Sequence, residues 1–321
     1  MRLPLLALLV ACAPHAEPPS SPGAEVTAQV TAQVTAQATA QATAQVTGRP
    51  ERGAGARKAL PSAHPAGVSG PVAPAAPPGE TAAPDAPRDA GCGDDGAGYD
   101  AAALRAQVAY LASAELDGRA SGSPGDVAAR AILAERFRCL GLVPGGASGS
   151  YEQPFTANGH ATANLVGYLP GDDAAVGSDI ILVGAHHDHL GDGHLGANDN
   201  ASGVAALLAI AQAARQHKTP RRTIGFVAFG GEELGLVGSA YFAAHPPAAL
   251  PLDRIVYDIN LDMVGSYHST GAVYAMGTFR GLPATAIVKA LSSEHPALHV
   301  GTGGRGVGSD HEAFCAAGVP Y

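Results

Sequence analysis

The chain has 321 residues, a net charge of −9 at pH 7 and only 15% charged residues. No lysine and arginine run is long enough to form a basic patch, so we expect neither nucleic acid nor an anionic lipid surface as a partner. Tryptophan is absent and aromatic residues are few, so leucine, valine, isoleucine and alanine must build any hydrophobic core.

Residues 1–11 are typical of an export signal. A single positive charge at Arg2 precedes the apolar stretch 3–10, which is too short to span a bilayer. The run that ends in Ala11 and Cys12 resembles a bacterial lipobox, in which the cysteine is lipidated and becomes the mature N-terminus. We therefore expect an exported protein, either an envelope lipoprotein or a periplasmic or secreted one. A lipid at Cys12 would be its membrane contact.

Residues 12–98 are predicted to form a disordered tether. Within them, 26–45 is five tandem copies of the tetrad Val/Ala-Thr-Ala-Gln, and the stretch after Gly48 is rich in proline, alanine and glycine. The tetrad has no large apolar side chain, so packing cannot offset the entropy lost on ordering.

Residues 99–321 are predicted to form the folded domain. Apolar residues at helical spacing predict helices near 104–116, 127–140 and 203–216. The third of these is expected to be capped by Asn200 or Ser202. Short runs rich in β-branched residues predict strands at 164–169, 180–184, 223–229 and 255–261. Alternating strands and helices predict an α/β fold, namely a three-layer sandwich whose mixed sheet is parallel at its centre.

Acidic side chains and one histidine follow the ends of these strands. His186 follows the strand at 180–184, Glu232 and Glu233 follow the next strand, and Asp262 closes the last one. Asp199 comes just before a helix, whose positive end favours an ionised carboxylate. Since the carboxyl ends of parallel strands meet at one edge of a sheet, these side chains should converge there. Nitrogen and carboxylate ligands without cysteine suit Zn²⁺ or a similar divalent ion.

In this order the motifs resemble those of the M28 zinc aminopeptidases. The motifs are His-x-Asp, Asp-Asn, Glu-Glu and Asn-Leu-Asp, and the resemblance covers 99–321. It implies that His186, Asp199 and Asp262 bind one zinc ion. Asp199 would also bridge to a second zinc ion, held by Glu233. The resemblance further implies Glu232 as general base, Asp188 as the residue that orients His186, and Asp310 with His311 in the substrate pocket.

The implied activity is hydrolysis of N-terminal peptide bonds in a peptide substrate, through a metal-bridged water. One ligand is missing from the pattern. In the family a further histidine follows the last core strand, and this chain ends at Tyr321, before that position. Either the sequence is C-terminally truncated, which we favour, or another residue such as His311 takes its place.

Two other functions stay open at this point. A glutaminyl cyclase resembles the same family but uses one metal ion. A catalytically impaired metal-binding fragment on a tether is the second alternative. Metal stoichiometry and hydrolysis of an aminoacyl anilide separate the three. No oligomeric state is predicted.

The remaining histidines and the cysteines are not expected to bind metal. We expect His187 and His189 to line the pocket or face solvent. Cys92 lies just before the first predicted helix and Cys139 ends the second, so a disulfide between them fits an oxidising compartment. Because Cys12 is assigned to lipid attachment, Cys315 is then expected to be a buried free thiol.

Overall fold

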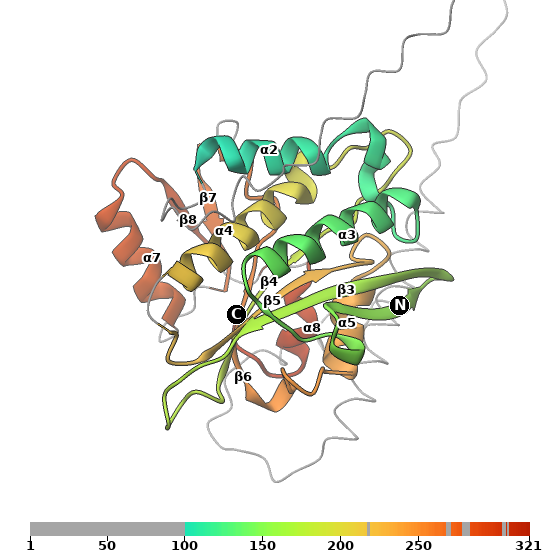
Figure 1. Cartoon of the computed structure of the whole chain (residues 1–321). Helices are drawn as coiled ribbons and strands as arrows, with labels where there is room; N and C mark the ends of the chain where they lie inside the picture. The colour runs from blue at the N-terminus through green and yellow to red at the C-terminus, as the bar shows by residue number, and fades with distance from the viewer. Residues whose placement is uncertain (1–99, 217–218, 268–270, 278–282, 304–305, 307) are drawn as a thin grey trace, which may run out of the picture.

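The computed structural model describes residues 100–216, 219–267, 271–277, 283–303, 306 and 308–321 (Figure 1). The predicted export signal at 1–11, the lipid site at Cys12 and the tether at 12–98 lie outside the described residues and stay predictions. Within the described part, no helix has both the length and the apolar character needed to cross a membrane.

Three helices cover one face of the sheet (Figure 1): α2 (Ala101–Leu111), α3 (Pro124–Cys139) and α4 (Gly203–Gln216). The first two begin at polar caps. Asp100 accepts hydrogen bonds from the N–H groups of Ala102 and Ala103 at 2.8 Å, and Ser123 accepts one from Asp126 at 3.1 Å. At α4, Asn200 accepts a hydrogen bond from the N–H of Gly203 at 3.0 Å. Of the two predicted caps, Asn200 is therefore the one that is used.

The first predicted helix is shorter than expected. It ends at Leu111, and the 3₁₀ turn η1 (Ala114–Arg119) follows it. Asp117 and Gly118 within this turn have φ values of 40° and 70°, which an α-helix cannot contain. The chain therefore reverses here and directs Arg119 into the protein.

Among the described residues, six strands form one mixed sheet in the order β1-β3-β5-β4-β6, with β2 paired to β3. The strands are β1 (Val143–Pro144), β2 (Glu152–Ala157), β3 (His160–Leu169), β4 (Ile180–His186), β5 (Thr223–Phe229) and β6 (Ile255–Asn260). Strand β4 is parallel to both β5 and β6, whereas β3 is antiparallel to β5. The predicted α/β fold with a centrally parallel, mixed sheet is confirmed.

Alternate residues of the strands face two separate cores, as the two-residue period of a strand requires. On one face, Leu165, Val183 and Phe226 pack with α2, α3 and α4. On the other face, strand residues pack against Phe242 and Phe314. Phe242 belongs to α5 (Val237–Ala244) and Phe314 to α8 (His311–Ala316), which lie together on the far side of the sheet in Figure 1. Helices on both faces make the three layers.

Smaller elements complete the described chain. They are the short turns η2 (Ala147–Gly149) and η4 (Leu252–Arg254), the helix α7 (Pro283–Glu294), and a parallel pair of strands, β7 (Val273–Ala275) and β8 (Val300–Thr302).

The cysteine assignment needs one correction. Cys139 and Cys315 are both disulfide-bonded, so the prediction of a free thiol at Cys315 is wrong. It failed because reserving Cys12 for a lipid left an odd number of cysteines, and sequence spacing alone does not reveal which sulfurs meet. Cys92 lies outside the described residues, so its pairing with Cys139 stays a prediction. Within one chain of four cysteines that pairing would leave only Cys12 for Cys315, so it and a lipid at Cys12 exclude each other.

Candidate metal centre

Three neighbouring strands end at the same edge of the sheet and deliver the predicted side chains there. His186 is the last residue of β4, the Glu232–Glu233 pair follows β5, and Asp262 follows β6. Because β4 is parallel to both neighbours, all three chain ends leave the sheet on one side. Asp199 comes from the wide turn η3 (Ala197–Ser202) that leads into α4.

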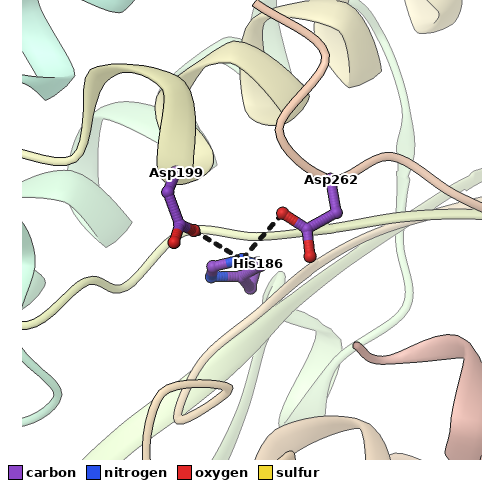
Figure 2. Close-up of side chains that lie close together, drawn as sticks. All are labelled: His186, Asp199 and Asp262. Atoms are coloured by element: carbon purple, nitrogen blue, oxygen red, sulfur yellow. Dashed lines mark ion pairs between the residues drawn. The ribbon is translucent and has the colours of Figure 1, made fainter. Parts of the chain in front are cut away.

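The first cluster consists of His186, Asp199 and Asp262 (Figure 2). Nε2 of His186 lies 3.2 Å from Oδ1 of Asp199 and 3.5 Å from Oδ1 of Asp262. The candidate ligand atoms lie within 4.8 Å of one another. Oδ1 of Asp262 is buried and has no hydrogen-bond partner among the described residues. A buried oxygen without a donor, beside an imidazole and a second carboxylate, fits a divalent cation.

The charge balance of this cluster also favours a cation. Burial alone would lower the pKa of His186, but the carboxylates of Asp188, Asp199 and Asp262, with the charge of Glu232, raise it well above its usual value. Three carboxylates around one imidazole form a strongly negative site. Such a site stabilises either a protonated histidine or a metal ion.

The second cluster consists of His189, Asp199 and Glu233. Nδ1 of His189 lies 2.6 Å from Oε1 of Glu233 and 3.9 Å from Oδ2 of Asp199. Asp199 thus presents one oxygen to each cluster, which is the arrangement expected of a bridging carboxylate. Among the described residues, the nitrogen beside Glu233 belongs to His189. The sequence favoured a ligand that a truncated chain lacks, with His311 as the alternative.

His187 is the other histidine that the structure places differently. It is fully buried, and its Nε2 lies 3.0 Å from Oδ1 of Asp126 in α3. Its main-chain N–H donates to the carbonyl of Phe229 at 2.8 Å. His187 therefore joins the loop after β4 to α3 and β5 and does not face solvent.

Asp188 links the two ends of the site. It is fully buried and accepts hydrogen bonds from the hydroxyl of Ser121 at 2.9 Å and from the N–H of Glu232 at 3.2 Å. Its Oδ1 lies 3.8 Å from Nδ1 of His186. Burial opposes its ionisation, but the contacts with His186, His187 and Ser121 lower its pKa. The geometry agrees with the implied role of orienting His186, and that role stays a proposal.

Glu232 lies at the rim of the first cluster, with Oε2 4.0 Å from Nε2 of His186. Burial raises the pKa of Glu232 to about 9. The positive charge of His186 lowers this pKa, whereas the negative charges of Asp310, Asp188 and Glu233 raise it further. Without a cation, burial thus favours the protonated form of this carboxyl. A nearby divalent ion would return it to the carboxylate form.

Asp310 and His311 lie at the start of α8, and both are buried. Burial, opposed by the charge of His186, raises the pKa of Asp310 to about 7. The ring of His311 packs against that of Tyr321, with centroids 4.7 Å apart. Neither residue belongs to a cluster of possible metal ligands among the described residues, and their predicted place in the substrate pocket stays a prediction.

Two supporting residues were missed by sequence reasoning. The hydroxyl of Ser309 donates to Oδ2 of Asp262 at 2.7 Å and accepts from Asn260 at 2.6 Å. The guanidinium of Arg119 is fully buried and donates to main-chain carbonyls around the site. The sequence does show Arg119 in a polar turn and Ser309 beside Asp310, but it does not show what these side chains contact.

An α/β sheet with imidazole and carboxylate clusters at its carboxyl edge defines a candidate metallohydrolase. Residues 164–321 match the family model described as peptidase family M28. Over this segment the chain belongs to peptidase family M28.

Two relatives and one solved structure illustrate the similarity. Leupeptin-inactivating enzyme 1 of Streptomyces exfoliatus is 34% identical over 172 residues, covering 52% of this chain and 36% of that protein. Aminopeptidase YwaD of Bacillus subtilis is 37% identical over 103 residues, covering 32% of this chain and 22% of that protein. The chain thus spans well under half the length of either relative. The zinc aminopeptidase BSAP of Bacillus subtilis shares the fold, with a TM-score of 0.57 at 18% identity over 69% of this chain and 83% of that one.

Proposed function

We propose that this protein is an exported, metal-dependent aminopeptidase that hydrolyses N-terminal peptide bonds. The observation that carries the proposal is the shared carboxylate of Asp199, which joins two clusters of possible metal ligands beside the partly buried Glu232. Membership of the family makes zinc the expected metal. The name of the Bacillus subtilis relative supports the choice of an aminopeptidase.

The roles of the side chains follow from their positions. His186, Asp199 and Asp262 would hold one ion, and Glu233 with Asp199 would contribute to a second. When bound, divalent ions would lower the pKa of a water molecule and polarise the scissile carbonyl. Glu232 would accept the proton of that water and transfer it to the leaving amine. Asp188 would hold the imidazole of His186 in place.

A bound metal ion would also favour the ionised form of Glu232 that a general base needs. A general base must be ionised, and Glu232 has a pKa of about 9 in the metal-free site. A cation near the clusters stabilises the carboxylate form and so prepares it to accept a proton.

The proposal is tested with an aminoacyl 4-nitroanilide and the full chain. We expect hydrolysis that a chelator abolishes and Zn²⁺ restores. The Nα-acetylated anilide should resist cleavage if a free amino terminus is required. A glutaminyl cyclase would instead release ammonia from an N-terminal glutaminyl peptide and leave the anilide intact. Failure to cleave any aminoacyl anilide in the presence of bound metal would contradict the proposal.

The variant Glu232→Gln tests the general base. Loss of the proton acceptor should lower kcat about 10²–10⁴-fold, whereas the metal content should change little, because Glu232 is outside both ligand clusters. Glu115→Gln, at an exposed glutamate of the turn η1, is the matched control and should keep full activity. If Glu232→Gln retains activity, another residue is the base.

We also propose that export leaves the protein attached to the cell envelope through a lipid at Cys12. This rests on the residues around the apolar stretch 3–10 and on nothing in the described structure. Radiolabelled palmitate should enter the wild-type chain and not Cys12→Ser in a bacterial host. Equal labelling of the two would contradict the proposal.

A further inference from the structure

The chain that leaves β5 and enters α5, residues 230–238, forms a loop with a narrow neck, which we call the Glu232 loop. It carries Glu232 and Glu233. Gly230 and Gly238 meet at the neck, where a Cβ atom at Gly238 would lie only 2.0 Å from the carbonyl oxygen of Gly230. Both glycines are buried, whereas residues 232–237 are partly exposed. The position of the loop relative to the metal-ligand residues therefore depends on how the neck is held.

One side chain holds both sides of this neck. Asn164 of β3 is fully buried. Its Oδ1 accepts a hydrogen bond from the N–H of Gly230 at 3.1 Å, and its Nδ2 donates to the carbonyl of Gly238 at 2.9 Å. An amide side chain carries an acceptor and two donors on one planar group, so it can join two main-chain segments in a way that an ionised carboxylate, which only accepts, cannot. Asn164 thus fixes the entry and the exit of the Glu232 loop to the sheet.

A second amide fixes the orientation of the first. Gln153 of β2 is the direct cross-strand partner of Asn164, and its Oε1 accepts from Nδ2 of Asn164 at 2.9 Å. Nε2 of Gln153 donates in turn to the carbonyl of His245 at 2.8 Å, just after the end of α5. Rotating the Asn164 amide by half a turn would bring two oxygens together at Gln153, so the network determines which end of Asn164 faces Gly230. The two amides therefore hold α5 near both of its ends.

Hydrogen bonds within the loop connect its neck to Glu232. The N–H of Val237 donates to the carbonyl of Gly231 at 3.0 Å, and the N–H of Leu236 donates to the carbonyl of Glu232 at 2.8 Å. The N–H of Glu232 itself donates to Oδ1 of Asp188 at 3.2 Å. Because Glu232 is only two residues from the neck and is braced by these bonds, a displacement of the neck should move its carboxyl group.

We propose that Asn164 is a positioning residue for the hydrolytic reaction, because its amide sets the place of the loop that carries the base. The inference rests on the proposed function for the role of Glu232. Asn164 itself lies outside both clusters of candidate ligands. Without its hydrogen bonds, Glu232 would shift from the place in which its Oε2 lies 4.0 Å from Nε2 of His186.

The variant Asn164→Ala removes both contacts with the neck. The full chain is assayed with an aminoacyl 4-nitroanilide at saturating Zn²⁺. We expect kcat to fall about 10²-fold with little change in KM, because a misplacement of about 1 Å can cost that much. Elemental analysis should still find the ion expected at His186, Asp199 and Asp262, since these residues lie outside the Glu232 loop.

Thr223→Val is the matched control, at the opposite end of β5. The hydroxyl of Thr223 makes the same kinds of bond as the amide of Asn164. It accepts from the N–H of Gly171 at 3.1 Å and donates to the carbonyl of Gly177 at 2.8 Å. Its loss should lower the melting temperature, because two main-chain groups lose their partner, but kcat should stay nearly unchanged.

Asn164→Asp keeps the shape of the side chain and isolates the hydrogen bonds. A neutral carboxyl group can still accept from Gly230 and donate to Gly238, whereas the ionised form has no proton to donate. Burial raises the pKa of the introduced carboxyl. The ratio of kcat in this variant to kcat in the wild type should therefore fall from about pH 6 to about pH 8, by at most about tenfold per pH unit. A role in stability alone predicts a ratio without this trend, measured well below the melting temperature.

Hydrogen–deuterium exchange followed by mass spectrometry reports on the loop without catalysis. Peptides that cover 230–238 should exchange faster in Asn164→Ala than in the wild type, and those of Thr223→Val should not. The inference is overturned if exchange in the loop is unchanged, or if kcat of Asn164→Ala falls no further than that of Thr223→Val. Should Asn164→Ala fail to fold, a kcat ratio for Asn164→Asp that does not change with pH overturns it. Faster exchange in the loop, with no hydrolysis by the wild type, would contradict the proposed aminopeptidase and leave the control of the loop by Asn164 standing.

Discussion

Asp258 places a carboxyl group in the middle of β6, inside the protein and away from the strand ends that hold the metal ligands. It is 1% exposed. Burial raises its pKa well above the usual value, and the negative charge of Asp310 on α8 adds to the effect. Neither carboxyl oxygen has a hydrogen-bond partner among the described residues. The folded protein therefore holds a proton that the unfolded chain releases above about pH 4.

This difference sets the direction of a pH dependence. A carboxyl whose pKa is raised on folding contributes stability below its unfolded pKa, and that stability is lost as the pH rises toward the folded pKa. We predict that Asp258→Asn removes this loss in the metal-free protein. Its free energy of unfolding minus that of the wild type should grow from pH 4 to pH 7, by at most about 1.4 kcal/mol per pH unit.

Urea unfolding at a series of pH values measures the effect. Asp253→Asn, at an exposed aspartate next to the same strand, is the control and should show no growing difference. A difference that stays constant with rising pH would show that the Asp258 carboxyl has the same pKa in the folded protein as in the unfolded chain, and a shrinking difference would show a lowered one. Either result would contradict the prediction.

At the scale of elements, hydrogen bonds from Arg119 connect several segments of the chain around the site. Its guanidinium donates to the carbonyl of His187 at 2.7 Å, to Leu195 at 2.9 Å and to Gly196 at 3.0 Å. It also donates to the carbonyl of Leu111 at the end of α2. Burial lowers its pKa to about 10, and the charges of Asp188 and Asp199 oppose this effect. Two of these carbonyls immediately precede η3, from which Asp199 projects.

We predict that Arg119→Ala destabilises the protein by about 3 kcal/mol or more, because each buried carbonyl left without a donor costs about 1–3 kcal/mol. Zinc affinity should fall as well, since the loops that carry His189 and Asp199 lose their anchor. Arg119→Lys should recover only part of both, because an ammonium cannot reproduce the planar fork of donors. Thermal unfolding and zinc titration measure the two effects.

Arg138→Ala is the control for the loss of an arginine. Arg138 lies on the exposed face of α3 beside Glu135, so its removal should leave the melting temperature and the zinc affinity nearly unchanged. Arg119→Ala with wild-type stability would mean that water replaces the guanidinium at those carbonyls.

The arrangement of the strands also explains which site residues could be predicted from the sequence. His186, Glu232, Glu233 and Asp262 could be placed together because parallel neighbours β4, β5 and β6 must end at one edge, and strand identity is visible in the apolar runs. His189 could not, because it lies three residues beyond β4 and its ring direction depends on the path of the loop. That path is held by Arg119, whose partners in this loop lie 68 to 77 residues away in the chain. No local pattern encodes such contacts.

At the scale of the whole molecule, the site exists only when all three layers are assembled. Its candidate ligands come from a strand end, a loop, a turn before a helix on one face, and two further loops. The orienting contacts add Ser121 before α3 and Ser309 before α8, on opposite faces of the sheet. An unfolded chain brings none of these groups together, so metal binding and folding should be coupled.

The central claim is that two metal ions share the carboxylate of Asp199. Anomalous diffraction from zinc-soaked crystals, recorded on both sides of the zinc absorption edge, tests it most directly. We predict two peaks flanking Asp199, one among His186, Asp199 and Asp262, the other beside Asp199 and Glu233. A single peak, or peaks that do not contact Asp199, would contradict the account.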